Sequence, residues 1–316
     1  MYKGELISLT VAISWTACAM FAEVASKRMG SLAVNVARML LSLLMLMGVM
    51  WWVLGVPYPA GSDASTWLWL SASGVVGYVL GDYCLFNSYI LIGSRYGQLL
   101  MTLAPPSAAI FGWLLLGEEM SLLAILGMVV TSAGIATAIY KPRHQDNASH
   151  RTSSQPLPLK GILFGIGAGI GQGVGLVLSA KGLQCYEAAL TASALDITRP
   201  EMILPFAATA IRAVTGLIGF TLWTWLSGHM ADLGRAFRDT RGMLFVLAAT
   251  ITGPFIGVSL SLMATLYTAT GIAQTIMAIT PVLILLPTYL IFHQRITARE
   301  VVGAVIAVIG VSLFFV

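Results

Sequence analysis

The sequence predicts an all-α integral membrane protein with ten transmembrane helices, arranged as two inverted repeats of five helices. The first observation is composition: of 316 residues, 58% are hydrophobic and 9% are charged, whereas soluble domains carry roughly 25% charged residues. A soluble fold of this length needs a larger polar surface, so lipid must surround most of the chain. The second observation is a series of apolar runs of membrane-spanning length. The third is a residue pattern that recurs in the two halves.

Ten apolar runs are long enough to cross a hydrocarbon core of roughly 30 Å, which takes about 20 helical residues. They lie at 4–25, 31–54, 66–90, 95–116, 121–140, 159–181, 205–228, 242–266, 271–292 and 297–316. The first run is longer than the core of a signal peptide, and we expect it to be retained. One hydrophilic stretch, from Lys141 to Pro158, is predicted to be a flexible linker. The chain therefore divides into a first repeat at 1–140, a polar linker at 141–158 and a second repeat at 159–316.

The two halves share polar and glycine positions at one spacing of 176 residues. This spacing relates Gln98 to Gln274, Pro105 to Pro281, Gly81 to Gly257, Gly127 to Gly303 and Gly134 to Gly310. Arg38 and Arg212 correspond at a slightly different spacing. Because each repeat has an odd number of spans, two tandem copies enter the membrane in opposite senses. Inverted repeats of this kind place a substrate site near the membrane midplane, between the repeats.

Basic side chains gather on the loops that follow odd-numbered spans. These residues are Lys27, Arg28, Arg95, Lys141, Arg143, Arg151, Lys160, Arg235, Arg238, Arg241, Arg295 and Arg299. The opposite side carries little beyond Lys3, Lys181 and Arg199. The positive-inside rule then makes the central linker cytoplasmic and places both termini outside an inner (cell) membrane. This distribution accounts for the net charge of +4, and without a basic patch interleaved with aromatics we expect no nucleic-acid partner.

Three stretches of sequence carry a family resemblance. They are AISW, which ends at Trp15, VARMLLS, which surrounds Arg38, and the run from Gly81 to Ile135, which contains Pro105. They resemble the drug/metabolite transporter superfamily, and within it the EamA-type transporters of ten helices. The resemblance covers essentially the whole chain, although the second half matches less closely. It implies export or exchange of amino acids, nucleotides, sugars or other small organic metabolites.

Three charged residues inside apolar spans are candidates for a binding cavity. Asp82 lies where an ionised side chain costs roughly 2.5–3.5 kcal/mol, so a partner, cavity water or protonation must offset that cost. In a functional role, Asp82 lines a cavity, where it binds a cationic group or relays a proton. In a structural role, it pairs with Arg38 or lies close enough to the interface to be hydrated. Arg38 and Arg212 either engage an anionic group such as a carboxylate or carry their charge to the interface by snorkelling.

The fourth and ninth spans hold matching polar and proline residues on one face. Gln98, Thr102 and Pro105 are spaced by four and three residues, as are Gln274, Ala278 and Pro281. Proline inside a helix frees a carbonyl and permits a kink, which leaves polar backbone that can face a cavity. The residues Gln98, Thr102 and Gln274 are therefore candidates for substrate binding, and Pro105 and Pro281 for hinges. The alternative is hydrogen bonding between helices by the two glutamines.

Aromatic and amide side chains complete the predicted cavity. A pocket that stacks a flat or amphipathic substrate could be lined by Trp15, Tyr83, Asn87, Tyr89 and Tyr267, although packing is the usual role of a single aromatic residue. Several other tryptophans lie near span ends and are predicted to form an interfacial belt: Trp51, Trp52, Trp67, Trp69, Trp223 and Trp225. Glu23 and Lys27, four residues apart, are predicted to be a surface pair.

The sixth span carries two series of glycines at steps of four. One series includes Gly169 and Gly173, and the other is 167, 171 and 175, with Gln172 between them. Small residues at this spacing let helix backbones approach closely, so we expect this helix to pack tightly between neighbours. Gly169 and Gly173 are candidates for a sliding gate, plain packing being the alternative, and Gln172 is a candidate for the cavity.

Motifs of enzymes are missing from the sequence: there is no HExxH, no CxxC and no glycine-rich phosphate loop after a strand. We therefore predict no enzyme activity, no metal site, no cofactor and no use of ATP. The prediction is a secondary transporter that moves a small organic metabolite, an amino acid or a related compound, with export as the direction. The alternatives are an integral membrane enzyme or lipid-handling protein, and a passive channel. Expected partners are a small-molecule substrate, the lipid bilayer and protons, with the chain acting as a monomer or a homodimer.

Overall fold

The computed structural model describes residues 2–116, 121–139, 157–193, 200–267, 276–293 and 296–313, and within these ranges the chain forms helices and no strands. Six of the helical stretches are long and apolar enough to cross a membrane. Two shorter apolar helices lie at Ile125–Ile139 and Thr280–Ile291. The all-α class is therefore confirmed, whereas the number of ten spans stays a prediction.

The first half forms a helical hairpin, a long interrupted helix and a separate helix. Its elements are α1 (Lys3–Met29), α2 (Ser31–Leu54), α3 (Ala64–Ser73), the π-helical η1 (Gly74–Asp82), α4 (Tyr83–Leu100), the 3₁₀ turn η2 (Met101–Leu103), α5 (Ala104–Leu116) and α6 (Leu122–Ile139). Gly30, at a positive φ that glycine adopts readily, makes the turn between α1 and α2. The Asp63 side chain accepts from the backbone N–H of Thr66 and so caps the start of α3.

Within its described residues, the second half repeats this order, with the short helix α9 added after its second helix. Its elements are α7 (Leu159–Ser193), α8 (Pro200–Leu226), α9 (Met230–Phe237), α10 (Thr240–Thr250), the π-helical η3 (Ile251–Val258), α11 (Ser259–Tyr267), α13 (Thr280–Leu283), α14 (Leu285–Phe292) and α15 (Ala298–Ser312). Shifting η1 by the 176 residues that separate Gly81 from Gly257 superimposes it on η3. Each half therefore interrupts its third span with π-helix at the same position of the repeat.

A break at Gly93 divides the predicted third span from the fourth. Gly93 has φ 83° and ψ 159°, which no α-helix contains, and the chain resumes as helix at Ser94. The backbone N–H of Ser94 donates to the Glu23 carboxylate of α1 at 2.7 Å. Glu23 also pairs with Lys27, but its side chain is only 3% exposed. The predicted surface pair is therefore wrong for Glu23: its carboxylate is buried because it caps the free N–H at the helix break.

The glycines of α7 let it lie between two neighbours, as the spacing predicts. A Cβ on Gly171 would come 2.9 Å from the Cα of Gly81, and one on Gly175 would come 2.8 Å from the Cα of Gly77, both in η1. On another face, a Cβ on Gly169 would lie 2.8 Å from the carbonyl oxygen of Leu100. Since no side chain fits at these positions, the two glycine series allow close backbone packing on η1 and on the η2–α5 region.

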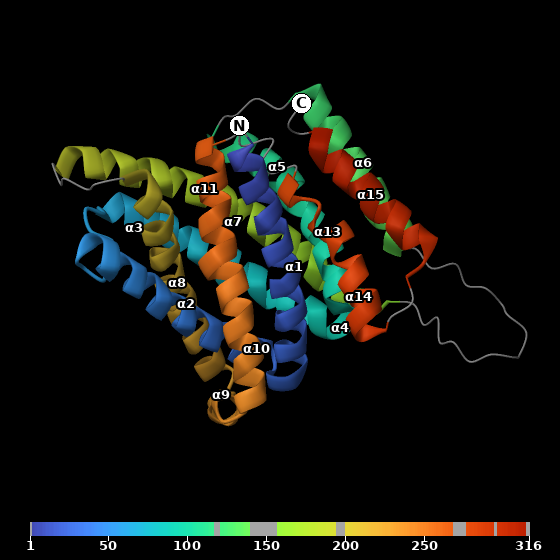
Figure 1. Cartoon of the computed structure of the whole chain (residues 1–316), viewed down its shortest axis with the longest axis horizontal. Coiled ribbons are helices and arrows are strands. Elements are labelled where there is room, and N and C mark those ends of the chain that lie inside the picture. Colours follow the sequence, from blue (N-terminus) through green and yellow to red (C-terminus); the bar gives the residue numbers. More distant parts are fainter. Residues whose placement is uncertain are drawn as a thin grey trace, which may run out of the picture.

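Helices α6 and α15 pack against each other along one edge of the molecule (Figure 1). A Cβ on Gly303 of α15 would lie 2.6 Å from the backbone nitrogen of Ala138 of α6. Further along, Gly134 meets Ala307 and Thr131 meets Gly310. Residue numbers therefore decrease along α6 as they increase along α15 from one contact to the next, so the two helices are antiparallel.

Much of the apolar side-chain surface is exposed in the way a lipid-facing surface requires. Of the predicted belt, Trp51, Trp52, Trp67 and Trp225 are exposed by 37% or more. Trp223 differs, because its ring stacks on Tyr83 with 4.4 Å between ring centroids.

Helix α9 has no counterpart among the predicted spans. It is too short to cross a membrane, and it lies beside the turn between α1 and α2 at one end of the molecule (Figure 1). Leu233 and Ala236, three residues apart, are its buried residues.

Candidate functional site

A group of buried and partly buried polar side chains lies where the two halves meet. Arg38 from α2, together with Tyr78 and Asp82 from η1, belongs to the first half, and Gln172 from α7 and Arg212 from α8 belong to the second. We call these five residues the central polar cluster. Asp82 is 4% exposed and Arg38 is 6% exposed, so these two charges are withdrawn from solvent.

Asp82 is the acceptor at the centre of this cluster. One of its oxygens forms a buried ion pair with an Nη of Arg38, and the other accepts a hydrogen bond from Nε2 of Gln172 at 2.7 Å. The same Nε2 also donates to the carbonyl oxygen of Gly77 at 3.0 Å. The predicted alternative of an Asp82–Arg38 pair is therefore what the structure contains, and Gln172 ties that pair to the other half.

Arg212 lies in the same cluster, but no carboxylate of the described residues is paired with it. Its guanidinium lies over the ring of Tyr78, 4.4 Å from the centroid, and within electrostatic range of Asp82. Among the described residues, no carboxylate forms an ion pair with it. Arg212 is 12 residues from the first residue of α8 and 14 from the last, so it cannot snorkel readily to either interface.

Three buried donors of the cluster have no hydrogen-bond partner in the described part of the chain. They are Nε of Arg38, Nε of Arg212 and the hydroxyl of Tyr78. Buried polar groups are nearly always paired. The cluster therefore holds more donors than it has acceptors.

A second layer of aromatic and polar side chains backs Arg38. Its guanidinium lies 4.7 Å from the centroid of the Phe86 ring, which stacks on Tyr89. The Tyr89 hydroxyl accepts from Nε2 of Gln98 at 2.8 Å. Gln98 is thus connected to the cluster through Tyr89 and Phe86, whereas the Thr102 hydroxyl donates to the carbonyl oxygen of Leu99, three residues earlier at the end of α4.

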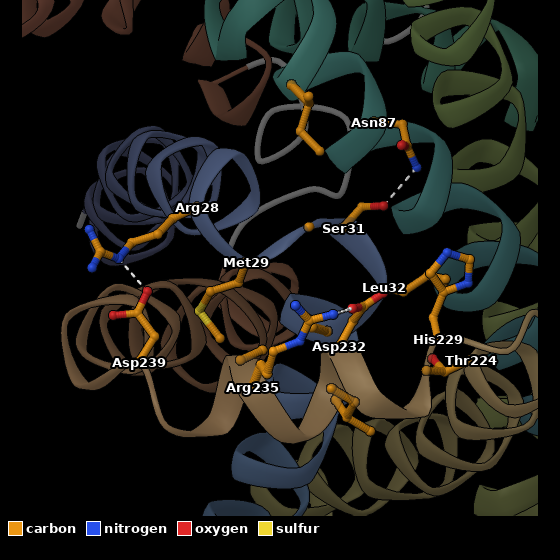
Figure 2. A pocket seen from close by; sticks show the side chains of 15 residues that line it. Arg28, Met29, Ser31, Leu32, Asn87, Thr224, His229, Asp232, Arg235 and Asp239 are labelled. Atoms are coloured by element: carbon orange, nitrogen blue, oxygen red, sulfur yellow. Dashed lines mark hydrogen bonds and ion pairs between the residues drawn. The ribbon is translucent and has the colours of Figure 1, made fainter.

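A cavity of about 510 Å³ opens at the end of the molecule where α9 lies. Figure 2 shows Asn87 and Ser31 on one side of it, joined by a hydrogen bond of 2.9 Å, and His229 on another. An ion pair between Arg28 and Asp239 lies at its edge.

The Arg28 guanidinium, with the Gly242 amide, holds the pKa of the Asp239 carboxyl below its usual value, so this pair is ionised at neutral pH. Asn87 is on α4, five residues beyond Asp82 on the chain, and is the predicted site residue that lines the cavity.

Three more of the predicted site residues lie outside the central polar cluster. Trp15 packs on η3, where a Cβ on Gly257 would come 2.6 Å from its Nε1. Tyr83 packs between Trp223 and Phe164. Tyr267, at the end of α11, is 55% exposed. Gln274 lies outside the described residues.

The predicted hinge and gate residues all lie at helix contacts or helix starts. Pro105 is in the first turn of α5, after the 3₁₀ turn η2, and Pro281 is in the first turn of α13. Proline is tolerated at such positions because the first N–H groups of a helix have no partner within it. Gly169 and Gly173 lie against the segment from Leu100 to Ala108. Their roles in motion stay predictions.

Tyr78 is the residue of the cluster that the sequence did not indicate. It lies four residues before Asp82 in η1, and its hydroxyl is buried. A tyrosine in an apolar span is common at membrane interfaces, so position alone gave no reason to place it beside two arginines. Within the described ranges, no group of three His, Cys, Asp or Glu side chains is placed to hold a metal ion.

The described part of the chain is helical and contains six apolar stretches of membrane-spanning length, so the protein is a multi-pass membrane protein. The model of the EamA-like transporter family matches residues 2–140 and 159–316, so the chain belongs to this family of membrane transporters. Curated protein sequences gave no match. One solved structure, titled only as the crystal structure of a protein, has a TM-score of 0.60 at 14% identity over 99% of this chain and 96% of that one. At this identity the likeness concerns the fold alone.

Proposed function

We propose that the protein is a secondary transporter that moves a small organic metabolite by alternating access, with its substrate site in the central polar cluster. The observation that carries the proposal is the composition of this cluster. The Arg38–Asp82 pair of the first half is held by Gln172 of the second, beside Arg212. Charges buried in a membrane are expensive and usually functional. A rearrangement of one half against the other would change the contacts that Gln172 and Arg212 of the second half make with Asp82 and Tyr78 of the first.

The packing of α6 on α15 supports an inverted repeat. The 176-residue shift converts the contact between Thr131 and Gly310 into the contact between Ala307 and Gly134. An antiparallel pair that maps onto itself in this way has a two-fold axis across it. Such an axis lies in the membrane plane when the helices cross the membrane, and this is the symmetry of transporters that alternate between two equivalent conformations.

The direction of transport is proposed to be export. The cavity of about 510 Å³ opens at the end where α1 meets α2, beside Arg28 and Arg235. By the positive-inside rule this end is cytoplasmic. A cavity on that side suits the loading of a cytoplasmic metabolite, such as an amino acid or a related compound.

Counterflow in proteoliposomes tests the proposal. Vesicles preloaded with an unlabelled mixture of the twenty amino acids, nucleosides and hexoses would be given each compound in labelled form. The expected result is saturable uptake of at least one compound, accelerated by the preloaded mixture and lost in Asp82→Asn. A change in the initial rate of uptake when a pH gradient is imposed would show that transport is coupled to protons.

Other outcomes assign other functions. Flux that rises linearly with concentration and shows no counterflow would identify a passive channel. Conversion of a lipid without net flux would identify a membrane enzyme or a lipid-handling protein. Either result would contradict the carrier.

A further inference from the structure

We infer that the substrate carries an oxyanion, a carboxylate or a phosphate, and that Arg212 binds it. The inference rests on the proposed function, because it places the substrate in the central polar cluster. It goes beyond that function by naming the chemical class of the substrate and the residue that recognises it.

The first argument is the balance of charge. The cluster contains two guanidinium groups, on Arg38 and Arg212, and one carboxylate, on Asp82, which is paired with Arg38. The repeat explains this imbalance: the arginine recurs in both halves, but the residue 176 positions after Asp82 is Val258. A net positive charge held within a membrane is costly. A bound anion would neutralise it, whereas a cationic or neutral substrate would not.

The second argument is the balance of hydrogen bonds. Nε of Arg38, Nε of Arg212 and the hydroxyl of Tyr78 are buried donors without an acceptor among the described residues. The ring of Tyr78 lies against the guanidinium of Arg212, and its side chain interacts electrostatically with Arg38. These donors therefore belong to one neighbourhood. A carboxylate or phosphate offers several acceptor oxygens and no obligatory donor, which is what this neighbourhood requires.

The third argument distinguishes Arg212 from Arg38. Arg38 is already occupied by Asp82, and one of its Nη atoms also approaches Oδ1 of Asn35 at 3.4 Å. Arg212 has no ion-pair partner among the described residues, and its Nε has no acceptor there. Its position is fixed by packing: a Cβ on Gly77 would lie 3.1 Å from its Nη2. Glycine at 77 thus leaves room for a guanidinium that has a fixed position and free donors. The planar fork of arginine matches a carboxylate or phosphate with two parallel hydrogen bonds.

The test is thermal stabilisation of the purified protein by matched pairs of compounds. The pairs are succinate with succinamide, L-phenylalanine with L-phenylalaninamide, and glycerol 3-phosphate with glycerol. We expect at least one acid to raise the unfolding temperature and its matched neutral or amidated compound to leave it unchanged. The pair that responds distinguishes a carboxylate from a phosphate.

Variants then assign the binding to Arg212. Arg212→Gln should weaken the affinity for the acid by about 10- to 100-fold, as expected when a hydrogen bond to a charged group is lost. Arg212→Lys, which keeps the charge but not the fork, should recover part of it. Arg238→Gln removes an exposed arginine outside the cluster and the cavity, and should bind like the unchanged protein. If Arg212→Gln does not fold, Tyr78→Phe, which removes only a hydroxyl, should weaken binding by about fivefold.

Three results would overturn the inference: no acid of the panel stabilises the protein, the matched compounds stabilise it equally, or the acid binds Arg212→Gln with unchanged affinity. Failure of the carrier function would look different. Counterflow of an amine or a neutral metabolite, without binding of any acid, would overturn the inference and leave the carrier intact. Binding of an acid through Arg212 without flux would support the anion site and contradict the carrier function.

Discussion

Replacing Asp82 with asparagine removes one negative charge from the central polar cluster and little else. The amide keeps an oxygen that can accept from Gln172, so the change isolates the ion pair with Arg38. Both side chains of that pair are nearly inaccessible, at 6% and 7% exposure. Solvent therefore screens the interaction between their charges only weakly. Removing one partner of a buried ion pair costs about 3–5 kcal/mol, mainly because the other charge is left unpaired. We expect a loss of that size in the free energy of unfolding.

The loss is measurable by denaturant titration in mixed micelles, followed by tryptophan fluorescence. A second change should reverse most of it: in Asp82→Asn combined with Arg38→Met, neither charge of the pair remains, and the coupling between the two positions follows from the double-mutant cycle. The control is Asp232→Asn, which breaks an exposed pair with Arg235 and should cost under about 1 kcal/mol. If Asp82→Asn destabilises the protein no more than Asp232→Asn does, the reasoning about a dry central cluster is refuted.

Three further predictions concern helix packing, the helix break and topology. Gly303→Ala places a Cβ 2.6 Å from a backbone nitrogen of α6 and should lower the free energy of unfolding by about 1–3 kcal/mol. The control Gly48→Ala, where the added Cβ meets open space, should lower it little. Equal effects of the two changes would argue against the α6–α15 contact. Glu23→Gln should speed amide exchange at the break after Gly93, since it weakens a charge-assisted cap, and the exposed Glu187→Gln should not. A reporter active only in the cytosol should be silent when fused at Val316, and activity there would reverse the proposed orientation.

Much of the fold follows from simple properties of the sequence. Apolar length identified the membrane-spanning stretches, because lipid offers the backbone no hydrogen-bonding partner and a span must satisfy its own backbone. The glycine spacing of α7 anticipated its close packing for an equally local reason: at steps of four residues, glycines share one helix face. The predicted boundaries were less accurate, and α7 extends to Ser193 rather than to 181.

The candidate site was predictable only in part. Asp82, Arg38, Arg212 and Gln172 were identified because polar and charged residues are rare in apolar spans, and the structure brings all four together. Tyr267 was identified on similar grounds but lies far along α11 with its ring exposed. Rarity in an apolar span indicates a special residue, but it does not say which residues share one place.

The sequence by itself determined the class of this protein, because hydrophobic length, basic loops and a repeated residue pattern are properties of the chain. Tertiary structure decided which arginine is neutralised. Arg38 and Arg212 are equivalent in the repeat, yet Asp82 pairs with Arg38 and leaves Arg212 against the ring of Tyr78. That difference depends on distances between helices that are remote in sequence, and electrostatic energy within a membrane depends steeply on such distances.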